Sequence, residues 1–152
     1  MAVRAIPEGY EGVTPYLIVH DGAAALEFYV KGLGAEELMR MPTPEGRIAH
    51  AEMRIGKAIF MVADESPDFL AHSPKTLKGT PVGLVVYVED VDAVFNRAVV
   101  AGAKVERPLA DQFYGDRSAT VEDPFGHKWT LSTHKEDLSP EEIEARAKAA
   151  GY

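Results

Sequence analysis

The first half of the chain opens with a short apolar run and continues with an amphipathic segment. Residues 16–19, Tyr-Leu-Ile-Val, are typical of a strand. Asp21 follows as a good N-cap, because its carboxylate can accept the free backbone N–H groups of a first helical turn. The pattern predicts a helix over residues 22–33 that ends at Gly34. A strand pair then turns at Gly56, with its strands over 47–54 and 57–63.

The same order of elements returns in the second half. A strand over 84–88 leads to Asp90 as a cap, a helix over 91–101 and Gly102 as its end. A second strand pair turns at Gly126, with its strands over 117–122 and 127–133. The matching glycines are 68 residues apart for Gly34 and Gly102, and 70 apart for Gly56 and Gly126. A repeat of this length predicts that one strand-helix-strand-strand-strand unit occurs twice.

We therefore expect a single domain over residues 1–152, made of two modules. Module 1 covers about 13–64 and module 2 about 82–134, and a linker of about 65–81 with three prolines joins them. Ser139-Pro140-Glu141-Glu142 has the order of a capping box with proline at the first helical position. It predicts a short C-terminal helix over about 139–149.

Composition narrows the choice of function. A chain of 152 residues that is 46% apolar can bury one sizeable core, and no apolar run approaches the roughly 20 residues that cross a bilayer. We expect a cytoplasmic protein without a membrane partner. The net charge of -8 disfavours nucleic acid as a partner and is compatible with a cationic ligand. The absence of cysteine excludes disulfides and thiolate metal ligands.

Three stretches carry a family resemblance over roughly residues 13–134: LIVHDGAAALEFYVKGLGAEEL, GLVVYVEDVDAVFNRAVVAGAKV and YGDRSATVEDPFGHKWTL. Together they resemble the vicinal oxygen chelate superfamily of glyoxalase I, fosfomycin-resistance proteins, extradiol dioxygenases and bleomycin-resistance proteins. The last stretch is most similar to the PhnB-like subgroup. The resemblance implies an α+β fold in which two βαβββ modules form a curved, mostly antiparallel sheet around a cleft, with the helices outside. It also implies a homodimer.

In the metal-using members of this superfamily, the resemblance places the ligands on the first and fourth strands of each module. The corresponding positions in this chain are expected to be Thr14, Phe60, Leu84 and Thr130. None of these side chains is a good ligand for a divalent metal, which prefers imidazole and carboxylate. We therefore expect no metal at these positions and no cofactor.

Several of the same side chains are candidates for a ligand-binding pocket. Residues at alternate positions share one face of a strand, so neighbours of the four positions extend the expected wall. The predicted pocket comprises Thr14, Tyr16, Ile18, His50, Phe60, Leu84, Tyr114, Arg117 and Thr130. Two alternatives stay open, because Arg117 could instead pin its own loop, and His50 with Glu52 could chelate a metal or exchange protons. Trp129 should face the helices if Thr130 faces the cleft.

The leading hypothesis is a metal-independent protein, similar to glyoxalases and bleomycin-resistance proteins, that binds a small organic molecule in the cleft. Drug sequestration would be one form of this function. The alternative is a lyase, isomerase or dioxygenase of the same superfamily with a non-standard metal or acid-base site. Whether the chain is an enzyme stays open at this point, and no catalytic residue is assigned.

Overall fold

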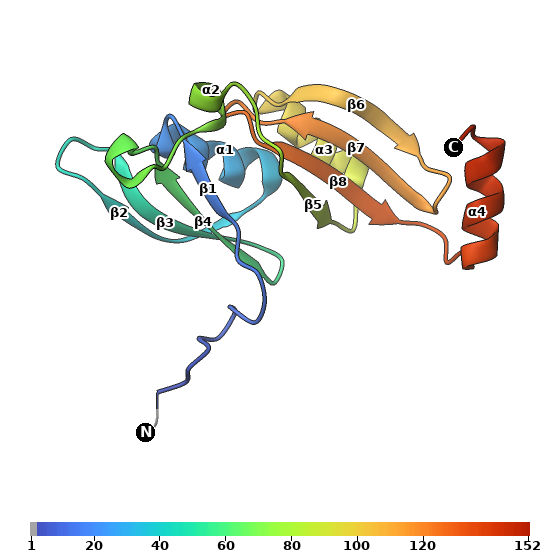
Figure 1. Cartoon of the computed structure of the whole chain (residues 1–152), viewed down its shortest axis with the longest axis horizontal. Helices are drawn as coiled ribbons and strands as arrows, with labels where there is room; N and C mark the ends of the chain where they lie inside the picture. The colour runs from blue at the N-terminus through green and yellow to red at the C-terminus, as the bar shows by residue number, and fades with distance from the viewer. Residues whose placement is uncertain (1–2) are drawn as a thin grey trace.

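The computed structural model describes residues 3–152 and shows two modules with the same order of elements (Figure 1). Module 1 consists of β1 (Tyr16–Val19), α1 (Gly22–Leu33), β2 (Glu36–Pro42), β3 (Ile48–Ile55) and β4 (Ala58–Asp64). Module 2 consists of β5 (Gly83–Tyr87), α3 (Val91–Val100), β6 (Lys104–Asp111), β7 (Asp116–Glu122) and β8 (Lys128–His134). The linker holds a 3-10 turn, η1 (Pro67–Phe69), and a short helix, α2 (Pro74–Leu77), and the chain ends in α4 (Pro140–Ala149).

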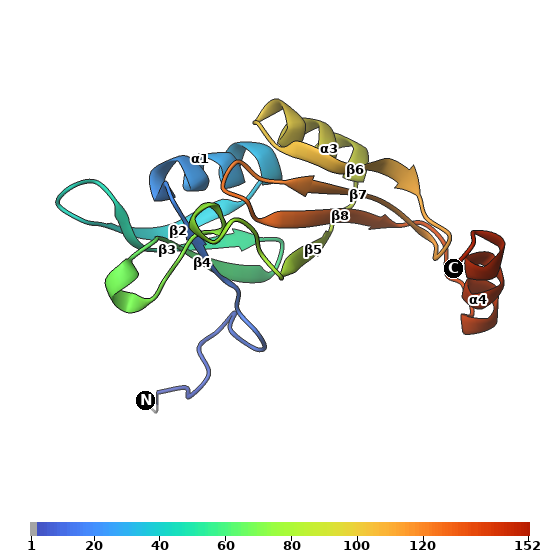
Figure 2. The same cartoon turned by 45° about the horizontal axis from the view of Figure 1, so that its top comes forward.

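Each module builds its own four-stranded sheet, with strand orders β1-β4-β3-β2 and β5-β8-β7-β6. The β1–β4 and β5–β8 pairs are parallel, and the other neighbours are antiparallel. Helices α1 and α3 pack on each other and lie on the same side of the two sheets (Figure 2). This arrangement confirms the expected α+β fold of two βαβββ modules. The strands form two mixed sheets, and the strand orders place β1 and β5, like β2 and β6, at sheet edges.

Strand register gives the spacing of the internal repeat. Tyr16 pairs with Met61 in the first sheet, and Val85 pairs with Thr130 in the second. Tyr16 and Val85 are 69 positions apart in the sequence, and so are Met61 and Thr130. The helix caps Asp21 and Asp90 have the same spacing. The matching glycines bracket this value at 68 and 70, because the turns that contain them differ slightly in length.

The core lies between the helices and one face of each sheet. Alternate strand residues point toward the helices and are buried, among them Leu17, Val62, Met53, Val121 and Leu131. We call the side of each sheet that faces away from α1 and α3 the open face. Trp129 is buried against the helices, as predicted, and its neighbour Thr130 points to the open face.

Asp123 links the two modules inside the core. It starts the Asp-Pro-Phe-Gly turn between β7 and β8 and is 2% exposed. One carboxylate oxygen accepts the backbone N–H groups of Phe125 and His127, each at 2.9 Å. The other accepts the hydroxyl of Tyr29 on α1 at 2.8 Å and the indole N–H of Trp129 at 3.0 Å. Burial and this carboxylate raise the pKa of Tyr29 well above its ordinary range.

The linker is tied down at several points, which its irregular sequence did not predict. Ser73 caps α2 and is fully buried, and its backbone N–H donates to Glu65 Oε2 at 2.9 Å. That bond and the hydroxyl of Thr76 lower the pKa of Glu65. Pro74 lies so close to Gly126 that a Cβ on this glycine would come within 2.8 Å of it. The linker is therefore held against both modules by specific contacts.

The C-terminal helix forms as predicted, with a full capping box between Ser139 and Glu142. None of its residues is buried, and the ring of Tyr152 beyond it packs on Phe113 at 5.1 Å. In the part of the chain that the structure covers, residues 3–152, every helix is too short or too polar to span a membrane.

Replacing Asp123 by alanine should destabilise the fold by about 3 kcal/mol or more, because it leaves buried N–H and O–H donors without an acceptor. The free energy of unfolding in urea measures this loss. Tyr29→Phe removes a single one of these bonds and should cost about 1 kcal/mol. Asp68→Ala, at an exposed site, serves as the matched control and should change stability by less than about 0.5 kcal/mol. Equal effects of Asp123→Ala and Asp68→Ala would contradict the role of Asp123.

Candidate functional site

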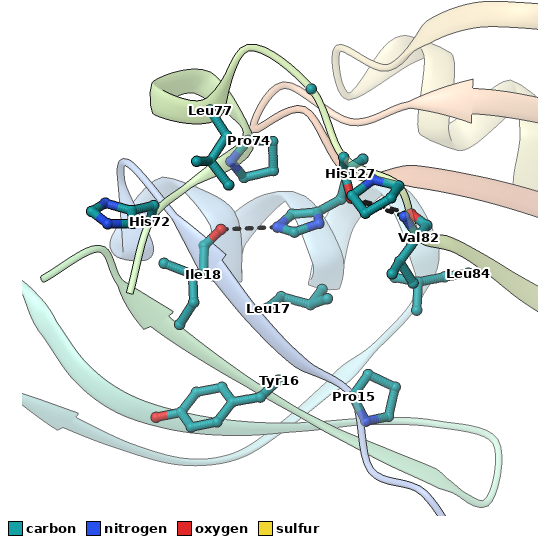
Figure 3. Close-up of a pocket in the computed structure, with 13 residues that line it drawn as sticks. Pro15, Tyr16, Leu17, Ile18, His72, Pro74, Leu77, Val82, Leu84 and His127 are labelled. Carbon is teal, nitrogen blue, oxygen red and sulfur yellow. Dashed lines mark hydrogen bonds between the residues drawn. The ribbon is translucent and has the colours of Figure 1, made fainter. Parts of the chain in front are cut away.

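A pocket of about 340 Å³ lies where the linker crosses the edge strands of both sheets (Figure 3). We call it the seam pocket. Its walls come from β1, from the linker with α2, from the start of β5 and from the β7–β8 turn. The side chains labelled in Figure 3 are Pro15, Tyr16, Leu17, Ile18, His72, Pro74, Leu77, Val82, Leu84 and His127.

His127 closes the seam between the modules. Its Nε2 lies 2.9 Å from the carbonyl oxygen of Ile18 on β1. A carbonyl oxygen can only accept, so Nε2 carries the proton in this bond. Because β1 is an edge strand, its backbone has polar groups that no neighbouring strand pairs, and the imidazole satisfies one of them.

The lining of the seam pocket is mostly apolar. Aliphatic and proline side chains dominate. The titratable side chains in the lining are those of Tyr16, His72 and His127. Leu77 and Val82 lie at the rim and are more than half exposed. A pocket of this size and character suits an apolar organic molecule with few polar groups.

A chain of polar side chains crosses the open face of module 1 from Tyr16 on β1 toward β3. The Tyr16 hydroxyl lies 2.9 Å from His50 Nδ1, and the two rings meet edge to face at 5.5 Å. His50 Nε2 lies 3.5 Å from Glu52 Oε1. The His50 and Glu52 side chains are 25% and 27% exposed. The Glu52 carboxylate and burial raise the pKa of Tyr10, and burial raises the pKa of Tyr16.

The open face of module 2 carries a second, polar pocket of about 360 Å³. Hydroxyl groups line its floor, and Thr120 and Thr130 contact each other there, with their oxygens 3.1 Å apart. The Tyr114 and Ser118 hydroxyls are 3.5 Å apart at its side. Its other lining residues are Arg107, Gln112, Phe113, Ala119 and Tyr152.

Beyond the polar pocket, Asp116 on β7 bonds side chains of β5 and β8, and the β8 side chain, His134, also contacts the loop before α4. The Asp116 carboxylate is 5% exposed and accepts the Tyr87 hydroxyl at 2.6 Å. Its other oxygen lies 2.8 Å from His134 Nδ1, while His134 Nε2 lies 2.9 Å from Asp137. The Asp116 hydrogen bond, followed by that of Asp137, raises the pKa of His134.

The structure divides the residues that the sequence placed in one pocket. Tyr16, Ile18 and Leu84 line the seam pocket, and His50 is bonded to Tyr16 beside it. Tyr114 and Thr130 line the polar pocket of the other module. Thr14 is half-buried directly before β1.

Two of the expected metal-ligand positions carry side chains on the helix side of their sheets. Phe60 lies in the core, with its ring 5.5 Å from Tyr29 and 5.8 Å from Trp129. Leu84 also points to the helix side, because it pairs with Trp129. The 69-residue spacing explains both orientations, since the partners of Thr130 and Thr14 in the repeat are Met61 and Gly83. A shift of one residue in a strand turns a side chain to the opposite face.

Arg117 has the pinning role that the sequence left open. Its guanidinium bonds both carboxylate oxygens of Asp92 at 2.9 Å and Asp111 at 3.1 Å. These carboxylates raise the pKa of Arg117, and Arg117 in turn lowers the pKa of Asp92. The arginine therefore ties the start of α3 to the end of β6.

Sequence reasoning missed the contribution of the linker and of His127 to the seam pocket. The one local signal was Ser73-Pro74, an N-cap followed by proline, which marks the start of a helix. Nothing in the local pattern shows that this helix covers β1. Among residues 3–152, no group of three or more His, Asp or Glu side chains is arranged to hold a metal ion.

Comparisons with known proteins find a family model, a sequence relative and similar solved structures. A model of the Glyoxalase/Bleomycin resistance protein/Dioxygenase superfamily matches residues 12–131. An uncharacterized protein of Mycobacterium tuberculosis is 41% identical over 154 residues, which cover 99% of this chain and 88% of the relative. The crystal structure of TioX from Micromonospora has a TM-score of 0.65 at 32% identity, covering 81% of this chain and 99% of TioX.

A fourth similarity concerns the fold alone. A PhnB protein from Bacillus cereus is 20% identical, with a TM-score of 0.62, and the match covers 81% of this chain and 99% of that protein.

The ion pairs of His134 should make stability depend on pH. Because the folded-state pKa is raised above the ordinary value, these contacts stabilise the fold fully below about pH 6 and are lost as the pH rises through the raised pKa. Melting temperatures of the wild type and of His134→Gln, measured across this range, should differ most at low pH and converge at high pH. A difference that is constant or grows with pH would contradict this assignment.

Proposed function

Because the chain belongs to the Glyoxalase/Bleomycin resistance protein/Dioxygenase superfamily, we propose that it binds a small, largely apolar organic molecule in the seam pocket without using a metal ion. The observation that carries this proposal is the pocket itself. It has about 340 Å³ of space between the two edge strands, and its walls are mainly aliphatic. Removing apolar surface from water is the dominant driving force for filling such a site.

The position of the seam pocket favours it as the binding site over the polar pocket on module 2. Both modules and the linker contribute walls, so the cavity exists only in the folded chain, and fixed contacts hold its two sides together. His127 binds the carbonyl of Ile18, and Pro74 packs against Gly126. Preformed walls lower the entropy that a ligand loses on binding.

The repeat supports binding without a metal. The residues that occupy the four matched positions on the open faces are Thr14, Met61, Gly83 and Thr130. A glycine offers no side-chain ligand, a thioether suits soft metals, and two neutral hydroxyls are weak ligands for divalent ions. The resemblance placed the ligands of metal-using members at such positions.

The lining also bears on the charge of the ligand. The net charge of -8 would attract cations to the molecule as a whole, but none of the side chains that line the seam pocket is acidic. A buried cation without an acidic partner loses its hydration without compensation. An uncharged ligand is therefore the better match for this pocket than the cationic ligand that composition suggested.

We further propose that two copies of the chain associate through their open faces. Helices α1 and α3 cover one side of the two sheets, and large apolar side chains stand exposed on the other, notably Tyr16, Val85 and Tyr87. Val85 and Tyr87 share one face of edge strand β5 and are 64% and 61% exposed. Exposed apolar surface of this kind is typical of a protein interface.

The binding proposal predicts that 2-naphthol, a neutral aromatic probe, binds the protein after dialysis against EDTA with the same affinity as before. Leu77→Trp should weaken binding by about tenfold or more, because the larger side chain occupies the rim of the pocket. Leu70→Trp introduces the same side chain elsewhere in the linker, at a position that is 83% exposed, and should leave the affinity unchanged. Isothermal titration calorimetry measures these four affinities. Affinity that disappears with EDTA would refute metal independence, and equal effects of the two variants would refute the site.

The dimer proposal predicts a molar mass of two chains in size-exclusion chromatography with light scattering. Val85→Asp should shift the protein to the mass of one chain, because the new carboxylate would be desolvated in the contact. Val100→Asp, at an exposed site on α3 away from the open faces, should leave the dimer intact. A wild type that elutes with the mass of one chain would rule the dimer out.

A further inference from the structure

A third cavity, of about 280 Å³, lies where α2 meets the β7–β8 turn (Figure 1). We call it the lysine pocket. It shares Pro74, Gly79 and Thr80 with the lining of the seam pocket, so this part of the linker forms a wall of both cavities. Its other lining residues are Lys75, Lys78, Glu122, Gly126 and Lys128.

The charge of this lining is opposite to that of the chain. Three lysines and one carboxylate line the cavity, whereas the whole chain has 24 Asp and Glu against 16 Lys and Arg. Lys128 is paired with Glu106 at 3.0 Å. Within residues 3–152, neither Lys75 nor Lys78 forms an ion pair. Two cations without a counter-charge therefore border one cavity, and both would attract an anion placed in it.

The backbone that carries the two unpaired lysines is fixed. The N–H of Gly79 donates to the carbonyl of Pro74 at 3.0 Å and closes the end of α2. Lys78 adopts the left-handed conformation of a helix end, with a φ of 59°. On the other side of α2, Pro74 packs against Gly126, two residues before Lys128. Because the fold sets these backbone positions, an anion would have to order only the lysine side chains.

We propose that the lysine pocket binds the phosphate group of a small anion, either free phosphate or a phosphate monoester. A phosphate carries up to two negative charges, and its oxygens accept several charge-assisted hydrogen bonds from ammonium groups. Lys75 and Lys78 belong to the linker and Lys128 to β8, so a bound phosphate would bridge the linker to module 2. The site does not depend on the ligand proposed for the seam pocket.

Glu122 gives the site a contribution of opposite sign. Strand register places Glu122 on β7 beside Lys128 on β8, and its carboxylate repels an anion in the cavity. Removing this charge should strengthen anion binding, while removing a lysine charge should weaken it. A surface that collects ions through its net charge alone would instead respond in the same way to the loss of any lysine.

The test titrates the protein with inorganic phosphate and, separately, with glycerol 3-phosphate by isothermal titration calorimetry at pH 8 and constant ionic strength. At least one probe should bind at one site per chain. Lys75→Gln and Lys78→Gln should each weaken this binding roughly fivefold, and Glu122→Gln should strengthen it roughly threefold. Lys57→Gln is the matched control. It removes the same charge from an exposed lysine between β3 and β4 and should leave the affinity unchanged.

Each outcome bears on the site. Tighter binding of inorganic phosphate identifies free phosphate as the ligand, and tighter binding of glycerol 3-phosphate identifies a monoester. A wild type that binds neither probe would overturn the proposal. Equal losses in the Lys75, Lys78 and Lys57 variants would also overturn it, because they would show a response to net charge alone. So would weaker binding by Glu122→Gln, since a carboxylate in the cavity can only repel the anion.

Discussion

The acceptance of four hydrogen bonds by Asp123 is the interaction on which the arrangement of this molecule depends. Its carboxylate is almost fully buried and binds the tip of the β7–β8 turn, the indole of β8 and the phenol of α1. A buried carboxylate without such donors would be strongly unfavourable, so the partners must occupy these places together. Because one partner, Tyr29, belongs to module 1, the same charge sets how the two modules meet.

The seam pocket follows from that junction. Once α1 and the β7–β8 turn are joined, His127 on this turn reaches the free edge of β1, and Gly126 offers the flat surface on which Pro74 of the linker rests. The linker then passes β1 and continues into β5, and the seam pocket lies between it and these two edge strands. A feature of the core thus determines where a ligand could bind, although none of its polar atoms belongs to the lining.

In both modules a side chain at the end of the fourth strand binds the first backbone N–H of the helix, but the residue type differs. At the end of β4, Asp64 accepts the first backbone N–H of α1, from Gly22, at 2.9 Å. At the matched position on β8, Thr133 accepts the first backbone N–H of α3, from Val91, at 3.0 Å. Each side chain ties a helix start to the strand beside it and satisfies a donor that the helix itself leaves free. The two modules therefore keep the same geometry, while their open faces differ in chemistry: module 1 carries a polar chain next to an apolar pocket, and module 2 carries a polar pocket.

The sequence by itself determined the elements, their caps and the repeat, because strand alternation, Asp and Ser caps and glycine ends depend on residues within a few positions of each other. It also showed that Trp129 packs inward. Only the tertiary structure decided which side of each sheet Phe60 and Leu84 face, since the spacing between turns differs by one residue from the spacing between strands. The seam pocket likewise rests on contacts between residues 94 and 109 positions apart, Tyr29 with Asp123 and Ile18 with His127. Such contacts form when distant segments pack together, and a local pattern carries no record of them.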